Sequence, residues 1–502
     1  MKQLIRSVAL QGYDGLVIDV ECRISRGLPA LIIVGYANRA VGEAKERVRG
    51  AFAASHLKLP SQRITINLAP GDMPKDGTGF DLAIAASILL AQDERHRVEA
   101  ASILLGELGL DGSVRPVRGL VGAILAARSH GHYAFYVPAG QYRQAALVPD
   151  ITLIPVQSLL ELERDLAGAS RLPRQPTGKG QLPVAIESAA DNLDFNQVVG
   201  QAQAKRGLEI AAAGGHNVLL NGPPGTGKSM LARALPSILP PLTQEEILEV
   251  THLHSLSGRG YKRLVTVPPF RAPHHSASSL SIIGGGSRPR PGEISLAHRG
   301  VLLLDEMPEF GRATLEALRQ PLEDKTINVT RAQESVTFPA NFILVATANP
   351  CPCGFYGTSR TCQCSPARLS AYRHKLSGPI LDRIDMYVDV GDINHPDLLT
   401  SNGAEPSKLV RQRVVATRQR QYARQGGLCN AQLDNHALRR HAALTPAAKS
   451  FLDSSAPKIQ LSARAYMRTV KLARTIADMA ASGPVETAHI TEALQYRKRA
   501  NP

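Results

Sequence analysis

Short β-rich runs and amphipathic segments alternate along the first region of the chain, residues 1–166. The β-rich runs predict strands, and segments with apolar residues at helical spacing predict helices. This mixture indicates an α+β or mixed α/β domain. The expected strands are 15–22, 31–34 and 63–67, and the expected helices are 41–56 and 81–91.

The middle region, residues 192–392, carries short strands that are apolar throughout. Strands of this kind belong to a buried parallel sheet that helices cover. We therefore expect an α/β domain with a parallel sheet. The expected strands are 216–220, 301–304 and 342–346.

Two further segments complete this organisation. Residues 167–191 are rich in Gly, Pro, Ser and Ala without sustained periodicity, which predicts a linker. Residues 393–502 repeat apolar positions at helical spacing, for example at Val410 and Val414, which predicts a helical C-terminal domain. The chain is therefore expected to be a multidomain α/β protein.

Length and composition agree with about three globular domains, since one domain averages about 150 residues. The chain has 502 residues, of which 43% are hydrophobic and 20% charged. It has no apolar run of the roughly 18 residues that span a bilayer, and no signal-peptide core at its start. We therefore expect a cytoplasmic protein without a membrane partner. Six cysteines are too few for a disulfide scaffold.

The chain is strongly basic, with a formal charge of +15. Most of the surplus lies in residues 401–502, which hold 17 Lys or Arg against 6 Asp or Glu. A surplus of this size favours a polyanionic partner such as nucleic acid. A basic interior channel or general solubility would account for it as well.

A glycine-rich segment, GPPGTGKS, follows the strand 216–220 and precedes an expected helix at 230–239. It matches the pattern G-x-x-x-x-G-K-S, whose glycines turn backbone N–H groups inward around phosphate oxygens. The lysine of the pattern reaches the β and γ phosphates of ATP, and the serine hydroxyl ligates Mg²⁺. The segment consists of Gly222, Pro223, Pro224, Gly225, Thr226, Gly227, Lys228 and Ser229.

Polar side chains follow the next two apolar strands. Asp305 comes directly after the strand 301–304, where it can hold the Mg²⁺ shell, and Glu306 can polarise an attacking water. Asn349 follows the third strand and can orient that water next to the γ phosphate. A P-loop, an acidic strand and a polar strand in this order predict ATP hydrolysis.

The set of motifs resembles that of AAA+ ATPases. The resemblance implies that Asn349 is sensor 1, that Arg383 in LDRID is the arginine finger and that Arg464 in LSARA is sensor 2. It also implies that Val199 and Gly200 contact adenine. Outside this context, either arginine would more often be a surface or ion-pair residue.

Four longer motifs occur in order along the chain: FRAPHH at 270–275, PGEISLAH at 291–298, ANPCPCG at 348–354 and LSGPILDRID at 376–385. They resemble motifs of a narrower group, the magnesium-chelatase-like YifB/ComM family of bacteria. The resemblance covers essentially the whole chain and implies a homohexameric DNA helicase that promotes branch migration of recombination intermediates during natural transformation. The residues themselves indicate only an ATPase.

The first region resembles the proteolytic domain of Lon proteases in MPKDGTG at 73–79 and in LGLDGSVRPVRGLV at 108–121. Lon proteases use a serine nucleophile that a lysine activates. The resemblance places Gly79 at the serine position and Val121 at the lysine position. Neither side chain can perform that chemistry, so we expect a Lon-type fold without proteolytic activity. A different dyad with Lys75 or Ser113 is the alternative.

Four cysteines lie within fourteen residues and form two C-x-C pairs. Four thiolates at this spacing can surround one tetrahedral Zn²⁺ ion, and a reducing cytosol disfavours disulfides. We expect a zinc knuckle within residues 351–364, with reduced free thiols and a redox switch as alternatives. Its ligands would be Cys351, Cys353, Cys362 and Cys364.

Two insertions in the middle region are candidates for DNA contact. Residues 271–299 combine consecutive glycines with Arg288 and Arg290, and residues 327–338 predict a β-hairpin with Arg331 near its tip. In related ring ATPases such insertions line the central pore, where cations and flexible glycines suit a phosphate backbone. Subunit packing is the alternative role. No base-reading motif is present, so contact with branched or single-stranded DNA is expected to be independent of sequence.

Three functions compete. The first is a hexameric DNA translocase, and the second is a magnesium-chelatase-type motor subunit that acts on a protein or metal-insertion partner. The third is a nucleotide-gated scaffold without enzymatic activity. The chelatase motor family is expected to lack the Lon-like first region and the four-cysteine knuckle, and a complete ATPase motif set disfavours a scaffold. The basic C-terminal region favours DNA.

Overall fold

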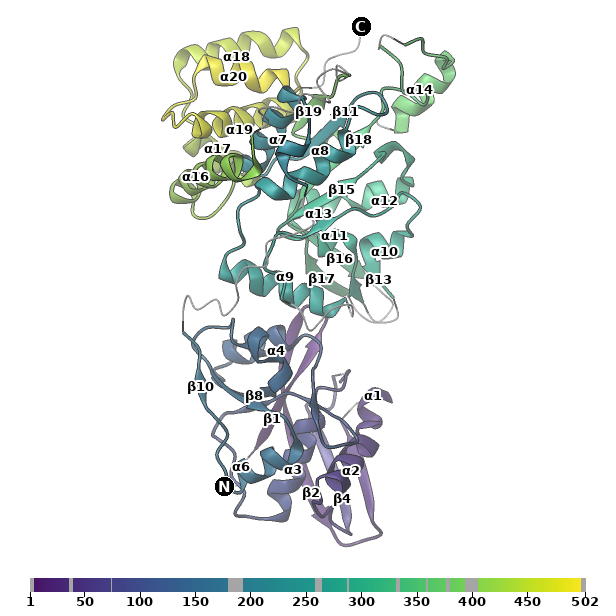
Figure 1. The fold of residues 1–502 in the computed structure, drawn as a ribbon, viewed down its shortest axis with the longest axis vertical. Helices are drawn as coiled ribbons and strands as arrows, with labels where there is room; N and C mark the ends of the chain where they lie inside the picture. Colours follow the sequence, from purple (N-terminus) through teal and green to yellow (C-terminus); the bar gives the residue numbers. More distant parts are fainter. Residues whose placement is uncertain are drawn as a thin grey trace.

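The computed structural model describes residues 4–35, 39–73, 75–178, 193–257, 264–286, 289–330, 335–357, 360–375, 380–392 and 405–497. The N-terminal sheet occupies one end of an elongated molecule (Figure 1). The central sheet follows it, and the C-terminal helices lie at the opposite end (Figure 1). The structure therefore has the expected mixed α/β, multidomain character.

The N-terminal region forms an eight-stranded sheet in the order β10-β9-β8-β5-β1-β2-β4-β3. Strands β1, β2 and β4 pair antiparallel, whereas β5, β8 and β9 pair in parallel. The strands are β1 (Ile5–Gln11), β2 (Asp14–Ser25), β3 (Ala30–Val34), β4 (Arg63–Ala69), β5 (Ile103–Leu104), β8 (Ala134–Pro138), β9 (Thr152–Val156) and β10 (Gln175–Pro176).

The expected strands of this region are confirmed in β2, β3 and β4. The expected helix 81–91 is confirmed as α3 (Asp81–Gln92), which is almost wholly buried against the sheet. The expected helix 41–56 is divided into α1 (Arg39–Gly42) and α2 (Ala44–Ala54). Gln175–Pro176, within the expected linker, form the edge strand β10, so the chain remains with this sheet through Pro176.

The central sheet has five parallel strands in the order β12-β15-β18-β11-β19. All three strands expected in this region are confirmed, and they are buried on both faces as parallel strands usually are. Of these five strands, β11 comes first in the sequence but lies between β18 and β19, which come last. The strand order therefore reverses beside β11. The strands are β11 (Val218–Asn221), β12 (Phe270–Arg271), β15 (Val301–Leu304), β18 (Ile343–Ala348) and β19 (Met386–Asp389).

Two insertions extend from this core. Between β12 and β15, the short ladder of β13 (Gly284–Gly285) and β14 (Arg290–Pro291) lies beside α10 (Ser279–Ile283) and α11 (Glu293–Leu296). Between β15 and β18, β16 (Thr326–Thr330) and β17 (Ser335–Pro339) pair antiparallel, which confirms the expected hairpin.

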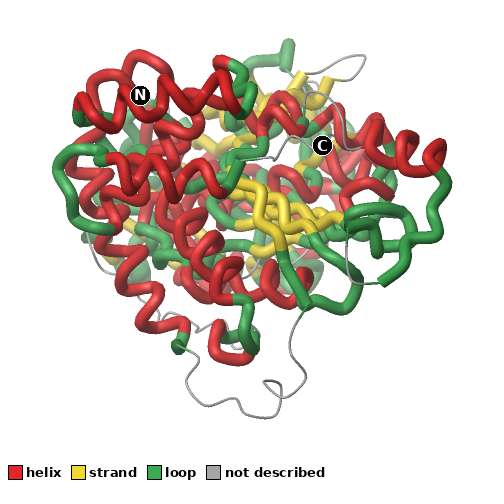
Figure 2. The backbone as a smooth tube through the Cα atoms, turned by 90° about the horizontal axis from the view of Figure 1, so that it is seen from above, coloured by secondary structure: helices red, strands yellow, loops and turns green. Residues whose placement is uncertain are grey.

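The C-terminal region is helical, as expected. Its apolar side chains share one buried cluster with helix α7 (Ala202–Gly214) of the core, so the two regions are packed firmly together. Figure 2 looks onto this end of the molecule, where the red helices surround the yellow strands. The helices are α16 (Ser407–Gln425), α17 (Asn435–His441), α18 (Pro446–Lys458), α19 (Ala463–Met479) and α20 (Thr487–Gln495).

The N-terminal sheet contacts the core through α4 (Leu120–Ser129) and α9 (Gln244–Leu256). Apolar residues of both helices belong to one buried cluster. The imidazole of His252 donates from Nε2 to the carbonyl oxygen of Tyr13 at 2.8 Å. Gly122 leaves room for this ring, because a Cβ there would lie 2.0 Å from His252 Cε1. Close packing therefore fixes α4 against the core.

Candidate nucleotide-binding site

The glycine-rich loop connects β11 to helix α8 (Lys228–Ala234) beside the point where the strand order reverses. Open α/β sheets bind ligands at the carboxyl ends of their strands at such a point. Gly225 and Gly227 have φ angles of 84° and 85°, which L side chains rarely adopt. A Cβ on Gly222 would lie 2.2 Å from the carbonyl oxygen of Val390. Glycine is thus required for both the turn and its close contact with the core.

Lys228 is the cation of this loop. Its ammonium donates to the carbonyl oxygens of Gly222 at 2.7 Å and Pro223 at 2.6 Å, and to Asn349 Oδ1 at 3.1 Å. Burial lowers the pKa of Lys228, and the carboxylates of Asp305 and Glu306 oppose that shift. The P-loop cation and the amide after β18 are therefore brought together, as their places in the sequence suggest.

Asp305 joins the ends of three elements. The hydroxyl of Ser229 lies 2.9 Å from each of its carboxylate oxygens, and the hydroxyl of Thr347 donates to Oδ1 at 2.6 Å. Thr347 also accepts from the backbone N–H of Glu306 at 2.9 Å. Glu306 has a φ of 54°, and its side chain is exposed beside the loop. A hydroxyl and two carboxylates are thus grouped within reach of the P-loop.

The segment before α7 contacts the same loop. Gln201 donates from Nε2 to the carbonyl oxygens of Gly391 at 2.6 Å and Thr226 at 3.3 Å. Val199 is half-buried and Gly200 is exposed just before this residue. The residues expected to contact adenine therefore lie next to the P-loop in space, although more than twenty residues separate them in sequence.

Arg383 lies away from its own P-loop. Arg383 precedes the first residue of β19, which pairs with the start of β11, whereas the P-loop follows the end of β11. Four strand residues span about 13 Å, so one strand length separates the two sites. Arg383 Nη2 lies 2.6 Å from Glu323 Oε1, and its hydrogen bond lowers the pKa of Glu323. The exposed Arg464 also acts electrostatically on Glu323.

The four clustered cysteines converge in space. Their Sγ atoms all lie within 4.8 Å of one another. Cys351 and Cys353 are 3.3 Å apart, Cys353 and Cys362 3.5 Å, and Cys351 and Cys362 3.8 Å. The backbone N–H of Tyr356 donates to Cys351 Sγ at 3.3 Å. A Zn²⁺ ion with four sulfur ligands at about 2.3 Å separates them by about 3.8 Å, so this cluster fits a zinc-thiolate site.

Of the candidate DNA contacts, the structure describes only Arg290. It is exposed in β14, on the ladder with β13. Arg288 and Arg331 lie outside the described residues.

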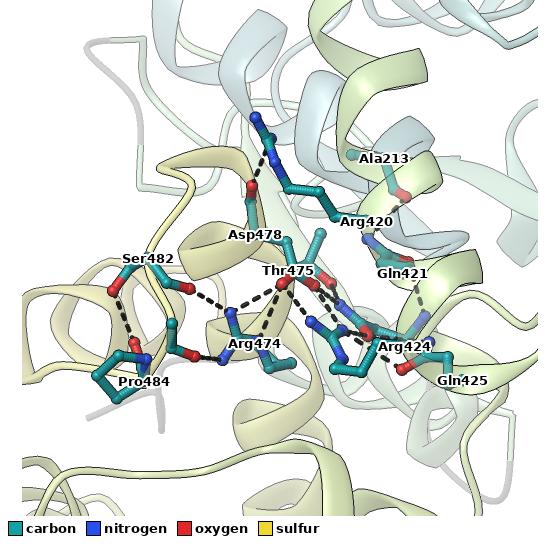
Figure 3. A network of polar contacts seen from close by, with 12 residues as sticks. Ala213, Arg420, Gln421, Arg424, Gln425, Arg474, Thr475, Asp478, Ser482 and Pro484 are labelled. Carbon is teal, nitrogen blue, oxygen red and sulfur yellow. Dashed lines mark hydrogen bonds and ion pairs between the residues drawn. The ribbon is translucent and has the colours of Figure 1, made fainter.

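Many arginines of the C-terminal region bind within the protein. Arg424 and Arg474 both form ion pairs with the buried carboxylate of Asp478, and Arg420 donates to its carbonyl oxygen (Figure 3). Arg411 donates to the carbonyl oxygen of Ser237, and Arg418 to that of Ala212. These arginines are therefore held within the protein rather than offered directly to a partner, while the net charge of the region is unchanged.

The N-terminal region carries the two substitutions that the Lon resemblance implies. Val121 is buried in α4, and Gly79 precedes α3. The alternative dyad is not formed, because Lys75 donates to the carbonyl oxygen of Pro70 and Ser113 donates to Asp111. In the described part of the chain, no helix combines the length and apolar character needed to cross a bilayer.

Sequence reasoning missed the roles of two residues of these sites. Thr347 is a polar residue inside an otherwise apolar strand, a signal that could have identified its role. Glu323 carries no local signal, because its contact with Arg383 joins segments far apart in the sequence.

Three families match consecutive parts of the chain. "Magnesium chelatase, subunit ChlI" matches residues 194–398, "Subunit ChlI of Mg-chelatase" matches 20–141, and "Magnesium chelatase, subunit ChlI C-terminal" matches 404–497. The second match corrects one expectation. The first region was expected to be absent from chelatase motors, but a chelatase family matches residues 20–141. The presence of this region therefore does not distinguish a chelatase motor from a DNA motor.

Individual relatives match almost the whole chain. Competence protein ComM of Haemophilus influenzae is 40% identical over 501 residues, which cover 98% of this chain and 97% of that protein. YifB of Escherichia coli is 40% identical over 499 residues, covering 98% and 96%. Lon protease of Mycolicibacterium smegmatis is 25% identical over 163 residues, or 31% of this chain and 20% of that protein.

The parallel sheet, the P-loop at its switch point and the helical C-terminal region define a protein of the AAA+ type with magnesium-chelatase-like domains. Within that class, the chain belongs to the YifB/ComM family.

Proposed function

We propose that this chain is an ATP-dependent, hexameric DNA helicase or translocase that promotes branch migration of recombination intermediates during natural transformation. One observation carries the enzymatic part: Lys228, Ser229, Asp305 and Asn349 converge at the carboxyl ends of three adjacent strands. The DNA part is supported by 40% identity to a protein named for competence.

ATP would lie in the P-loop, with its adenine against Val199 and Gly200 and its phosphates along residues 222–229. The side chains present fit Mg²⁺, which prefers oxygen ligands, because the Ser229 hydroxyl and the Asp305 carboxylate are adjacent. Bound Mg²⁺ would neutralise charge on the phosphate oxygens. Lys228 would exchange its loop carbonyls for phosphate oxygens.

Glu306 is the proposed base for hydrolysis, because its exposed carboxylate follows Asp305 directly. It would accept a proton from the water that attacks the γ phosphate, and Asn349 would orient that water. Thr347 would position both acidic residues through its bonds to the Asp305 carboxylate and the Glu306 backbone.

Arg383 would act on the nucleotide of a neighbouring subunit, and Arg464 would serve as sensor 2. Arg383 contacts Glu323, one strand length from its own P-loop. A group in this position can complete a phosphate site only across a subunit interface, which supports a homohexameric ring. In such a ring, an arginine supplied in trans increases hydrolysis by about 10³–10⁵-fold.

The insertions would provide the DNA contacts, with Arg288 and Arg290 on one and Arg331 on the other. Because a phosphate backbone is uniform, cationic loops of this kind suit a motor that does not read sequence. The cysteine cluster would hold one structural Zn²⁺ ion through Cys351, Cys353, Cys362 and Cys364.

The second candidate is a magnesium-chelatase-type motor subunit that acts on a protein or metal-insertion partner. The three family matches favour it, since each carries a chelatase description. The internal pairing of the C-terminal arginines also weakens one argument for DNA.

One experiment separates the two candidates. The ATPase rate of purified hexamers is measured without DNA, with linear duplex and with a four-way junction, and junction movement is followed by gel. Stimulation by the junction together with ATP-dependent strand exchange is expected. Hydrolysis with neither DNA binding at low salt nor junction movement would contradict the helicase and favour the chelatase-type motor.

A further inference from the structure

The loop that carries the four clustered cysteines contacts the P-loop directly. Gly354 lies between the two C-x-C pairs and has a φ of 88°. A Cβ on Gly354 would lie 2.4 Å from Cδ of Pro224 and 2.9 Å from its Cγ. The backbone at Gly354 therefore contacts the pyrrolidine ring without an intervening side chain.

A second connection runs through the backbone. Cys351 is buried and follows Asn349 by two residues, and Asn349 accepts a hydrogen bond from Lys228. After the cysteines, the chain returns in α14 (Pro366–Lys375), where the backbone of Asn349 lies close enough to the buried Tyr372 to oppose the rise that burial causes in the pKa of its hydroxyl. The cysteine loop thus touches the nucleotide site at the P-loop and at Asn349.

The turn itself depends on the first cysteine pair. The backbone N–H of Gly354 donates to the carbonyl oxygen of Cys351 at 2.9 Å, which closes a tight turn between Cys351 and Cys353. A metal bound by the thiolates of Cys351 and Cys353 would hold both side chains in place and so stabilise this turn. Loss of the metal would leave the turn with one backbone hydrogen bond, and the contact with Pro224 would loosen.

We propose that the metal-loaded cysteine cluster braces the P-loop, so that zinc occupancy and nucleotide affinity are coupled in this protein. The proposal rests on the ATP and zinc sites proposed above. Coupling of this kind is reciprocal: zinc tightens nucleotide binding, and nucleotide tightens zinc binding by the same free energy. Couplings between protein sites are typically about 5–150-fold in affinity.

The test measures the affinity for a fluorescent ATP analogue before and after a zinc-selective chelator, with Mg²⁺ kept in excess. Zinc is quantified by elemental analysis, and circular dichroism checks the fold. We expect one zinc per chain and nucleotide binding that is at least about 5-fold weaker after stripping. Cys22→Ser, a cysteine in the N-terminal sheet outside the cluster, is the matched control and should behave as wild type.

Two variants isolate the contact. Pro224→Ala removes the ring that Gly354 touches, so it should keep one zinc while its nucleotide affinity no longer responds to stripping. Gly354→Ala forces a Cβ against the ring without removing a ligand, so it should keep the metal and bind nucleotide more weakly. Because Gly354→Ala tests the contact without removing the metal, it remains informative even if zinc removal unfolds the chain.

The outcomes are distinguishable. One zinc per chain with an unchanged nucleotide affinity after stripping, and with Gly354→Ala like wild type, would overturn the coupling alone. Absence of zinc in protein purified without chelator would overturn the metal site. Absence of nucleotide binding by the zinc-loaded wild type would overturn the proposed ATPase instead.

Discussion

The hydroxyl of Ser229, at the start of α8, lies 2.9 Å from both carboxylate oxygens of Asp305, at the end of β15. This contact joins the P-loop to the acidic strand. It places the two proposed Mg²⁺ ligands side by side, whereas Glu306, one residue further on, turns out to solvent at a φ of 54°. The side chains of these adjacent acidic residues therefore occupy different positions, and substituting each one should cause a different defect.

Glu306→Gln should retain nucleotide binding and lose turnover, because it keeps the shape of the site but removes the base. We expect ATP hydrolysis to fall by about 10²–10⁴-fold. Asp305→Asn should instead weaken Mg²⁺-dependent nucleotide binding. Steady-state ATPase rates and binding of a fluorescent analogue with and without Mg²⁺ distinguish the two defects. Undiminished hydrolysis by Glu306→Gln would remove this residue from the mechanism.

Arg383→Ala should abolish ATP hydrolysis. Mixing it with a second inactive variant, Glu306→Gln, should restore part of this activity. If Arg383 acts in trans, about a quarter of the interfaces in an equimolar mixture with Glu306→Gln subunits contain both intact groups, since ring interfaces are head-to-tail. Mixing the two inactive proteins should therefore restore part of the ATPase rate.

The control for this mixing experiment is Lys228→Ala mixed with Glu306→Gln. Both of these changes damage the P-loop side of the same nucleotide site, so no interface in their mixed rings is intact. Recovery in both mixtures, or in neither when mixed rings have been demonstrated by mass spectrometry, would contradict action in trans.

His216 should make stability depend on pH between about 6.5 and 4. Burial lowers the pKa of this imidazole to about 4. Its Nε2–H donates to Thr475 Oγ1 at 2.8 Å, because the Thr475 hydroxyl itself donates to the carbonyl oxygen of Lys471. As the pH falls through this window, the unfolded chain takes up a proton that the folded chain excludes. Stability therefore decreases on acidification, by about 3 kcal/mol at most.

The check compares thermal unfolding midpoints from pH 7 to pH 4.5. His216→Gln keeps an N–H donor for Thr475 but does not titrate, so its midpoint should fall less steeply than that of wild type. His436→Gln, an exposed histidine of α17, is the control and should follow wild type. Parallel pH profiles for wild type and His216→Gln would refute the assignment.

The sequence predicted elements and motifs well where the signal is local. The strands β11, β15 and β18 are apolar up to Leu220, Leu304 and Ala346, and the P-loop pattern has fixed spacing, so both were recognisable from the residues alone. The convergence of the four cysteines also follows from their spacing and the turn at Gly354.

Contacts between distant segments could not be predicted in this way. Nothing near His252 in the sequence indicates that it packs on Gly122, 130 positions earlier, or that Gly354 touches Pro224. Composition likewise does not show where charges lie. Tertiary packing holds both Arg424 and Arg474 against the carboxylate of Asp478.

DNA affinity should depend on the two insertions rather than on the C-terminal helices. Arg331→Ala and Arg290→Ala should each reduce the ratio of ATPase rates with and without junction DNA. Each should also lower the slope of log affinity against log salt by about 1, because one fewer phosphate is neutralised. Arg26→Ala is the control. This exposed arginine follows the last residue of β2, whereas the first residue of β2 follows Tyr13, which contacts the core. Fluorescence anisotropy at several salt concentrations provides the measurement. Equal slopes for all three variants and wild type would place the DNA-binding residues elsewhere.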